Sequence, residues 1–282
     1  MDYFVSIENT RYHRWQLALL QESMRMLGIE DNLLVAWATN PNEEPLPIKG
    51  RNFEHDNIGF KHRYTPINKP YAMTNAIAKK LIQPPFCVID PDMVFVRPIP
   101  QKDAPVAAQY CWHMTLEYFQ TINWHFLEDL HMEMAKPTWL PIGYIYQFND
   151  IPTFLFEEIY HCCMDLTAMY KLGDGKLKNE QAYWVKEMIA WALPLSILGK
   201  HVEICHDFQT PLDRANSRCA ATDNPNACLI HYYNSYKPYF DKSQYFGVDA
   251  LPYNDILSIP TPESNLLVKH LQTITQNVMM QS

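Results

Sequence analysis

Phe86-Cys87-Val88-Ile89-Asp90-Pro91-Asp92 is the stretch that decides the fold, because four apolar residues run directly into two carboxylates. A short apolar run of this kind, preceded by Pro84-Pro85, predicts a buried strand. Carboxylates two residues apart on an extended chain point to the same side. At the carboxyl end of a parallel strand they lie where open α/β sheets bind ligands. Burying such a strand is costly unless the charge is used, so we interpret Asp90 and Asp92 as a functional pair.

The residues around this stretch predict an α/β fold. Residues 3–7 and 32–37 are apolar strand candidates, and residues 15–27 between them have helical spacing that ends at Gly28. A strand–helix–strand order is typical of a parallel sheet. Residues 40–69 are polar and loop-rich. We expect further helices over residues 71–82, 116–134, 152–170, 179–193 and 264–280, and strands over residues 143–148 and 228–231. The prediction is a mixed, mostly parallel sheet flanked by helices.

Composition excludes several classes of protein. The chain has 282 residues with 23 Lys and Arg against 31 Asp and Glu, a net charge of −8, which argues against a nucleic-acid partner. It has only 8 glycines, and neither a dinucleotide-binding nor a P-loop glycine motif occurs. We find no linker that divides the chain and expect one domain over residues 1–282.

The sequence also carries expectations about location. Asp2 stands where a secretory signal would have basic residues, and no apolar run reaches about 18 residues. The 7 cysteines form no C-x-x-C pair. We therefore expect reduced thiols, no membrane span and a cytoplasmic protein.

Two further groups of polar residues are candidates for chemistry. His231 follows a predicted strand and could ligate a metal, and Lys237, six residues on, could neutralise a diphosphate. Asn179-Glu180-Gln181 opens a predicted helix on which Glu187 shares a face with Glu180. For each group an ordinary structural role stays open: a hydrogen-bonded histidine, a solvated lysine, or a capping or ion-paired glutamate.

Together these pieces resemble the glycosyltransferases of the GT-A fold. Asp90-Pro91-Asp92 resembles their D-x-D motif, and residues 231–239 resemble the H-x-x-G-x-x-K-P-W motif of glycogenin-like retaining enzymes. His231, Lys237 and Pro238 match that motif, whereas Asn234 replaces its glycine and Tyr239 its tryptophan. Asn179-Glu180-Gln181 is similar to the D-Q element of the same group.

Other segments are similar to the plant hydroxyproline O-arabinosyltransferases and peptidyl serine α-galactosyltransferases. The resemblance extends over about residues 3–240 and rests on residues 12–16, 68–72, 90–98, 184–188 and 230–232. Lys69 stands where those enzymes tend to have arginine, so a positive charge is kept without the bidentate fork.

The resemblance implies a retaining transferase that moves a sugar from a UDP-sugar to a hydroxyl acceptor with Mn²⁺ or Mg²⁺. It divides the chain into a nucleotide-binding half (residues 1–100), an acceptor and catalytic half (101–250) and a C-terminal extension (251–282). The acceptor, whether peptide serine or hydroxyproline, glycan or small molecule, stays open. The implied roles are metal binding by Asp90, Asp92 and His231; donor binding by Ser6, Asn9, Tyr12, Lys69, Asp90 and Lys237; and catalysis by Glu180, Gln181 and Glu187.

Two other functions use the same residues. The first is a nucleotidyltransferase or another metal-dependent nucleotide-sugar enzyme, although Glu8-Asn9-Thr10-Arg11 lacks the glycine-rich loop usual in nucleotidyltransferases. The second is a non-catalytic protein that binds a nucleotide sugar, for which removal of the metal would leave nucleotide binding unchanged.

Overall fold

A computed structural model describes most of the chain. It covers residues 1–40, 48–121, 138–172, 180–197, 201–211, 226–232, 240–248, 250–260 and 266–281. Within these ranges the side chains of residues 169–172, 180–184 and 210–211 are not described. The predicted helix over residues 116–134 therefore falls partly outside the described residues, with α4 spanning Leu116–Thr121.

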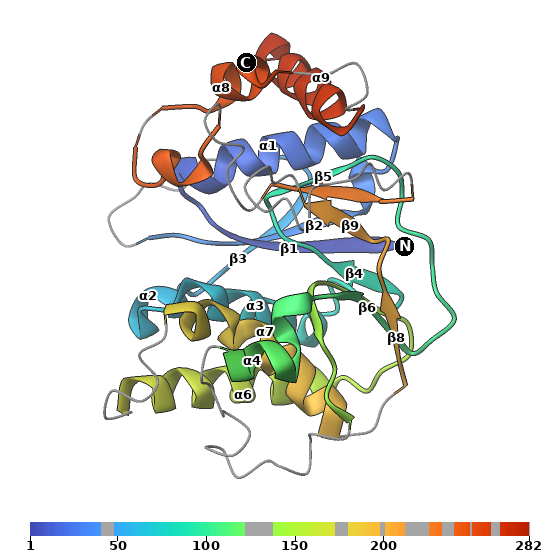
Figure 1. Cartoon of the computed structure of the whole chain (residues 1–282), viewed down its shortest axis with the longest axis vertical. Coiled ribbons are helices and arrows are strands. Elements are labelled where there is room, and N and C mark those ends of the chain that lie inside the picture. Colours follow the sequence, from blue (N-terminus) through green and yellow to red (C-terminus); the bar gives the residue numbers. More distant parts are fainter. Residues whose placement is uncertain are drawn as a thin grey trace.

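The centre of the molecule is a mixed sheet of seven strands (Figure 1). In spatial order they are β3 (Arg51–His55), β2 (Leu33–Ala38), β1 (Asp2–Glu8), β4 (Phe86–Val88), β7 (Ile142–Phe148), β6 (Val106–Tyr110) and β8 (Val202–Cys205). All pairs are parallel except the two that β7 makes with β4 and β6. The predicted mixed, mostly parallel α/β fold is confirmed.

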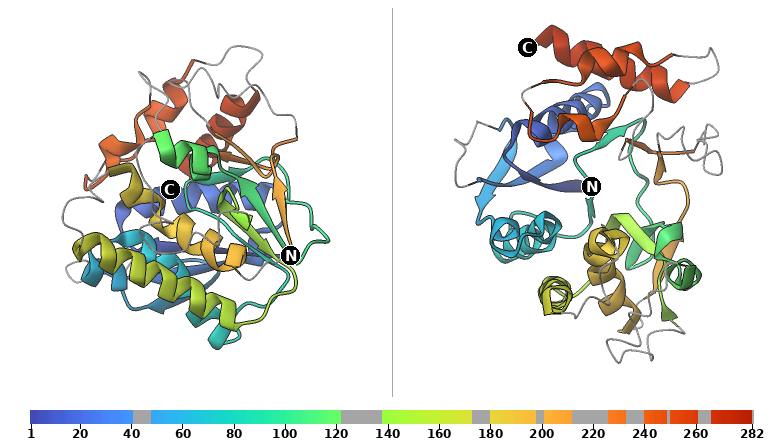
Figure 2. Two further views of the ribbon diagram at one scale, coloured as in Figure 1. Left: turned by 60° about the horizontal axis from the view of Figure 1, so that its bottom comes forward. Right: turned by 60° about the vertical axis from the view of Figure 1, so that its left-hand side comes forward.

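Helices cover both faces of this sheet, as Figures 1 and 2 show from three directions. One face carries α2 (Ile58–His62), α3 (Asn68–Ala78), α6 (Phe154–Leu172) and α7 (Glu180–Ile197). The other carries α1 (Arg11–Met26), which is covered in turn by α8 (Tyr253–Ser258) and α9 (Leu266–Gln281). Short 3-10 helices are η1 (Glu30–Asn32), η2 (Thr65–Ile67), η3 (Trp112–Met114) and η5 (Lys242–Tyr245). None of the helices in the described ranges is both long enough and apolar enough to span a bilayer.

The alternating direction of the side chains along β1 explains why helices cover both faces of the sheet. Phe4 packs into the core beneath α3, α6 and α7, whereas its neighbours Tyr3 and Val5 pack into the core on the α1 side. Successive strand side chains point to opposite faces. A strand that is apolar at consecutive positions is therefore stable only with a layer of packing on each face.

A second, smaller sheet determines where the site forms. It consists of β5 (Met93–Phe95), β10 (Leu229–His231) and β9 (Gln209–Pro211), with β10 in the middle. β10 runs antiparallel to β5, with His231 opposite Met93, and parallel to β9. This pairing brings a late segment of the chain to the residues that follow β4.

The structure corrects two expectations. The stretch 40–69 is not all loop, since it includes β3, α2 and η2. Asp90 and Asp92 do not lie on a strand, because β4 ends at Val88 and both acids lie in the turn before β5. Pro91 has no N–H group and cannot continue a strand ladder, which explains the turn. The strands β6, β8 and β9 were not predicted at all.

Gly59 has no side chain, which allows the backbone around Thr65 to pack closely against it in the segment that leads into α3. An added Cβ at Gly59 would lie 2.8 Å from the Thr65 Cα and 2.8 Å from the Asn68 amide nitrogen. The Gly59 N–H also donates to the Asn68 side-chain oxygen at 2.8 Å. The contact with Thr65 involves backbone, so an added methyl group forces the chain apart.

We predict that Gly59→Ala lowers the free energy of unfolding by about 1–3 kcal/mol, the usual cost of overpacking. Chemical denaturation measures this change. Lys61→Ala, at an exposed position of the same helix, is the control, and its effect is expected to stay within about 0.5 kcal/mol. Equal stability of the two variants would contradict the prediction.

Candidate metal and donor site

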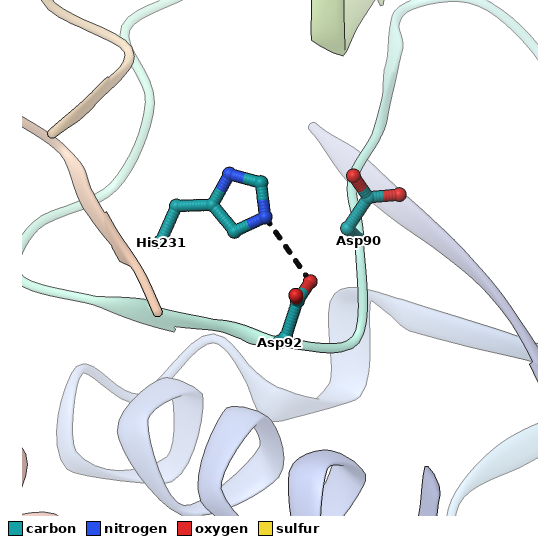
Figure 3. Close-up of side chains that lie close together, drawn as sticks. All are labelled: Asp90, Asp92 and His231. Atoms are coloured by element: carbon teal, nitrogen blue, oxygen red, sulfur yellow. Dashed lines mark ion pairs between the residues drawn. The ribbon is translucent and has the colours of Figure 1, made fainter. Parts of the chain in front are cut away.

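Asp90, Asp92 and His231 come together at the carboxyl edge of the central sheet. One ligand atom from each side chain lies within 4.8 Å of the other two. Figure 3 shows the His231 ring directed at Asp92, with Asp90 beside them. Nε2 of His231 is 3.2 Å from Asp92 Oδ1. The cluster joins two distant parts of the sequence.

Backbone pairing holds this cluster in place. The N–H of Tyr232, the residue after His231, donates to the Asp92 carbonyl oxygen at 3.1 Å. The N–H of Ile89 donates to the Phe4 carbonyl oxygen at 3.0 Å, which extends the β1–β4 pairing by one residue toward the turn. The turn is thus attached to both sheets, and the acids have little freedom to separate from the imidazole.

Asp92 is a buried carboxylate with two cationic or donor partners. Besides His231, the Lys242 ammonium donates to Asp92 Oδ2. Burial opposes ionisation of Asp92, but Lys242 and His231 outweigh it and hold its pKa well below the usual range. Asp92 is therefore ionised, as a metal ligand must be.

Asp90 belongs to a second buried ion network. Lys69 Nζ lies 2.5 Å from Asp90 Oδ1 and 3.1 Å from Glu187 Oε1. Burial lowers the pKa of the Lys69 ammonium, but the two carboxylates outweigh it and raise the pKa above its ordinary value. One lysine therefore bridges the acid of the turn and an acid of α7.

Glu187 is held on three sides. Its carboxylate accepts from the Trp191 indole N–H one turn further along α7, and its backbone N–H donates to the Tyr64 hydroxyl at 2.9 Å. Burial raises the pKa of Glu187, and the charge of Asp90 adds to the shift, although Lys69 opposes it. The contacts with Trp191 and Lys69 thus fix the direction of this carboxylate, and its pKa depends on the charges of Lys69 and Asp90.

The His231 ring is positioned by two residues. Nδ1 lies 3.1 Å from the Gln209 amide oxygen, which can accept from an Nδ1–H and would then leave the Nε2 lone pair for a bound ion. The Tyr144 ring packs edge-on against it, with centroids 4.9 Å apart. Tyr144 has φ +70°, a left-handed conformation that costs energy in a bulky residue. Its hydroxyl lies 3.0 Å from His113 Nε2.

A cavity of about 380 Å³ opens onto these groups. Ser6, Tyr12, Lys69, Glu187 and Lys242 are in its wall, together with the three residues of the cluster. The Ser6 hydroxyl oxygen is buried and has no hydrogen-bond partner among the described residues. A cavity with charged side chains and an unpartnered hydroxyl in its wall is suited to a ligand that carries polar groups.

The sequence-predicted site residues divide into three groups. Asp90, Asp92, His231, Ser6, Tyr12, Lys69 and Glu187 meet at the cavity. Asn9 does not line it; its side-chain oxygen accepts from Arg14 Nε at 2.8 Å. Lys237 lies outside the described residues, as do the side chains of Glu180 and Gln181, whose backbone belongs to α7.

Sequence reasoning missed Lys242, Gln209, Tyr144, His113 and His13. His13 and Lys242 line the cavity beside Tyr12, and the other three hold His231 or its neighbours. The one available signal was that His13 lies in the stretch 12–16 on which the sequence resemblance rests.

The donor set fits a divalent metal ion. Two carboxylate oxygens and one imidazole nitrogen, all within 4.8 Å, are ligands that Mn²⁺ and Mg²⁺ accept, with open positions left for phosphate oxygens and water. The cluster faces the cavity, so a bound ion would be accessible to a ligand there.

Comparison with known proteins identifies the fold. No protein-family model and no curated protein matches the sequence. The structure is similar to that of the galactosyltransferase LgtC in complex with donor and acceptor sugar analogues, with 12% identity, a TM-score of 0.51, and 98% of this chain and 96% of that chain covered. This likeness shows that the chain has the GT-A-like fold of glycosyltransferases.

Two further solved structures are similar to the chain. The bifunctional glycosyltransferase WbbM has 15% identity and a TM-score of 0.49, over 97% of this chain and 52% of that chain. The glycosyltransferase GlyE of Streptococcus pneumoniae TIGR4 has 10% identity and a TM-score of 0.48, over 99% and 64%.

The environment of His113 generates a pH prediction. Burial, with a contribution from His231, lowers its pKa from 6.5 to about 4. Between these values the unfolded chain binds a proton that the folded chain does not. The free energy of unfolding therefore falls as the pH is lowered from 6.5 toward 4, by at most about 1.4 kcal/mol per pH unit from this group.

We expect His113→Gln to show a shallower loss of stability over this pH interval than the native chain. Urea denaturation at a series of pH values measures the slope. His201→Gln, at an exposed residue, controls for the loss of a histidine as such. Identical slopes for the native chain and His113→Gln would show that His113 is not kept neutral.

Proposed function

We propose that this protein is a metal-dependent retaining glycosyltransferase that transfers a sugar from a UDP-sugar to a hydroxyl acceptor. The observation that carries the proposal is the convergence of Asp90, Asp92 and His231 on one cavity at the ligand-binding edge of a GT-A-like sheet. The similarity of the fold to LgtC, whose structure contains donor and acceptor sugar analogues, supports a sugar donor.

In this proposal Asp90, Asp92 and His231 hold Mn²⁺ or Mg²⁺. The ion supplies Lewis-acid stabilisation for a leaving nucleoside diphosphate. Lys69, fixed between Asp90 and Glu187, supplies a second positive charge in the wall of the cavity. Preorganised charge of this kind stabilises the charge that develops in the transition state.

The remaining donor contacts follow from the cavity wall. The buried Ser6 hydroxyl binds the nucleotide, and Tyr12 stacks on the base. Tyr12 is supported edge-on by the Phe246 ring, with centroids 5.3 Å apart. Asn9, whose side-chain oxygen accepts from Arg14, keeps its proposed donor contact on the sequence resemblance alone, and Lys237 keeps its proposed contact with the diphosphate on the motif alone.

Glu187 is the described residue best placed to face the transferred sugar. It lines the cavity, and its carboxylate is oriented by Trp191 and Lys69. A rigid carboxylate on the face opposite the leaving group stabilises positive charge at the anomeric carbon. Glu180 and Gln181, earlier on α7, stay candidates for the same face from the sequence resemblance.

The division of the chain, its location and the alternative functions remain proposals from the sequence. We propose a nucleotide-binding half (1–100), an acceptor and catalytic half (101–250) and a C-terminal extension (251–282). A cytoplasmic location is proposed from the cysteines, of which all six in the described ranges are free. A nucleotidyltransferase or a non-catalytic binding protein would use the same acid pair, and turnover assays separate these alternatives.

The first test is UDP-sugar turnover with Mn²⁺ for the native chain and for Asp92→Asn. We expect the variant to lose at least about 100-fold in activity, because a metal ligand is weakened. Asp150→Asn, at an exposed acid, is the control. EDTA should abolish native turnover. Equal turnover by native chain and Asp92→Asn would reject the metal assignment, and UDP binding without turnover would indicate a non-catalytic protein.

The second test concerns Glu187. Glu187→Gln keeps an oxygen that can accept from Trp191 but removes the negative charge, so we expect kcat to fall by about 100-fold while the donor KM changes by less than about threefold. Steady-state kinetics measure both constants, and NMR of the product gives the anomeric configuration. An inverted product would contradict the retaining assignment, and an unchanged kcat would exclude Glu187 from the reaction.

A further inference from the structure

Lys242 is a buried cation in the cavity to which the proposed function assigns no role. Its side chain is only 12% exposed, and its ammonium donates to Asp92 Oδ2. The ammonium also lies 5.7 Å from the centre of the Tyr12 ring, the proposed base-stacking residue. Lys242 therefore stands between the metal ligands and the nucleotide end of the cavity.

The backbone that carries Lys242 is anchored on both sides. Phe240 before it and Tyr245 after it are buried in the core formed with Trp15 and α9. Asp241 caps η5 by accepting from the Ser243 N–H at 3.1 Å, and the Tyr245 hydroxyl donates to Asp255. The main chain is thus held at the cavity, while the long side chain can change direction through its rotatable bonds.

The present partners of Asp92 conflict with metal binding. Both of its oxygens are engaged, Oδ1 by His231 and Oδ2 by Lys242. A divalent ion held by Asp90, Asp92 and His231 needs at least one of these oxygens. It would also place two positive charges close to the ammonium, and in a buried site that repulsion is large. The ammonium must therefore leave Asp92 when the ion binds.

The charges of the cavity indicate where the ammonium goes. Four carboxylates (Glu8, Asp90, Asp92 and Glu187) and two ammonium groups (Lys69 and Lys242) are in the cavity wall, which gives a net formal charge of two negative charges. A divalent ion alone would cancel this charge. The ion together with a diphosphate that carries two negative charges restores the original balance. A phosphate oxygen then offers the released ammonium a new acceptor.

We propose that Lys242 exchanges partners, leaving Asp92 when the divalent ion binds and donating instead to the diphosphate of the donor. This inference rests on the proposed function and deepens it, because it makes Lys242 a donor-binding residue outside the motif that contains Lys237. It also makes the ion and the nucleotide bind cooperatively, since each removes the electrostatic cost of the other.

The test uses Lys242→Met, which keeps the length of the side chain and removes its charge. Without its competitor on Asp92, Mn²⁺ alone should bind several-fold more tightly. UDP in saturating Mn²⁺ should bind at least about tenfold more weakly, because a charge-assisted hydrogen bond is lost. Electron paramagnetic resonance of free Mn²⁺ measures the first affinity, and calorimetry with UDP measures the second.

Two control variants test whether the effects come from the positive charge at this position. Lys242→Arg keeps the positive charge, so its UDP affinity should stay within about threefold of the native value. Lys102→Met removes a lysine that pairs with Glu203 at 3.0 Å and does not line the cavity, so both affinities should stay native. Thermal melting of every variant verifies that it is folded.

The opposite signs of the two changes distinguish partner exchange from a structural ion pair. If Lys242→Met weakens Mn²⁺ and UDP binding together, or leaves UDP binding unchanged, the exchange is refuted while the proposed function stands. If the native chain binds neither Mn²⁺ nor UDP, the proposed function fails and this inference fails with it. Tighter Mn²⁺ binding together with weaker UDP binding supports the exchange.

Discussion

The antiparallel pairing of β10 with β5 is the constraint on which the site depends. It sets His231 opposite Met93, and the adjoining Tyr232 N–H donates to the Asp92 carbonyl at 3.1 Å. Backbone hydrogen bonds between strands are specific in register, and a shift of one residue would turn the imidazole away from the acids. The geometry of the candidate metal site is thus a consequence of strand register rather than of side-chain attraction.

Charge balance is the second constraint, and it connects the two halves of the site. Asp92 is neutralised from one side by Lys242, and Asp90 and Glu187 share Lys69 on the other. Removing one partner of a buried ion pair leaves an uncompensated charge, which costs about 3–5 kcal/mol. The two lysines therefore compensate the buried carboxylates, and a metal ion would have to compete with Lys242 for Asp92.

The central strands and long helices could be predicted because their apolar patterns are local. β1 and β2 were expected within about one residue of their observed ends, and α6, α7 and α9 within about four. β3 was missed because Arg51–His55 is a polar, exposed edge strand. β9 was missed because it has only three residues, and its pairing with β10 is not visible in either segment alone.

The sequence by itself determined the α/β class and the acid pair with its candidate imidazole. The reason is local: an apolar run that ends in Asp90 and Asp92 predicts a buried strand with two carboxylates at its carboxyl end. Only the tertiary structure decided that Asp90 and Asp92 lie in a turn, that Gln209 and Tyr144 orient His231, and that Lys242 pairs with Asp92. Those contacts join segments far apart in the chain. Their geometry depends on packing and strand register, which no local pattern of residues encodes.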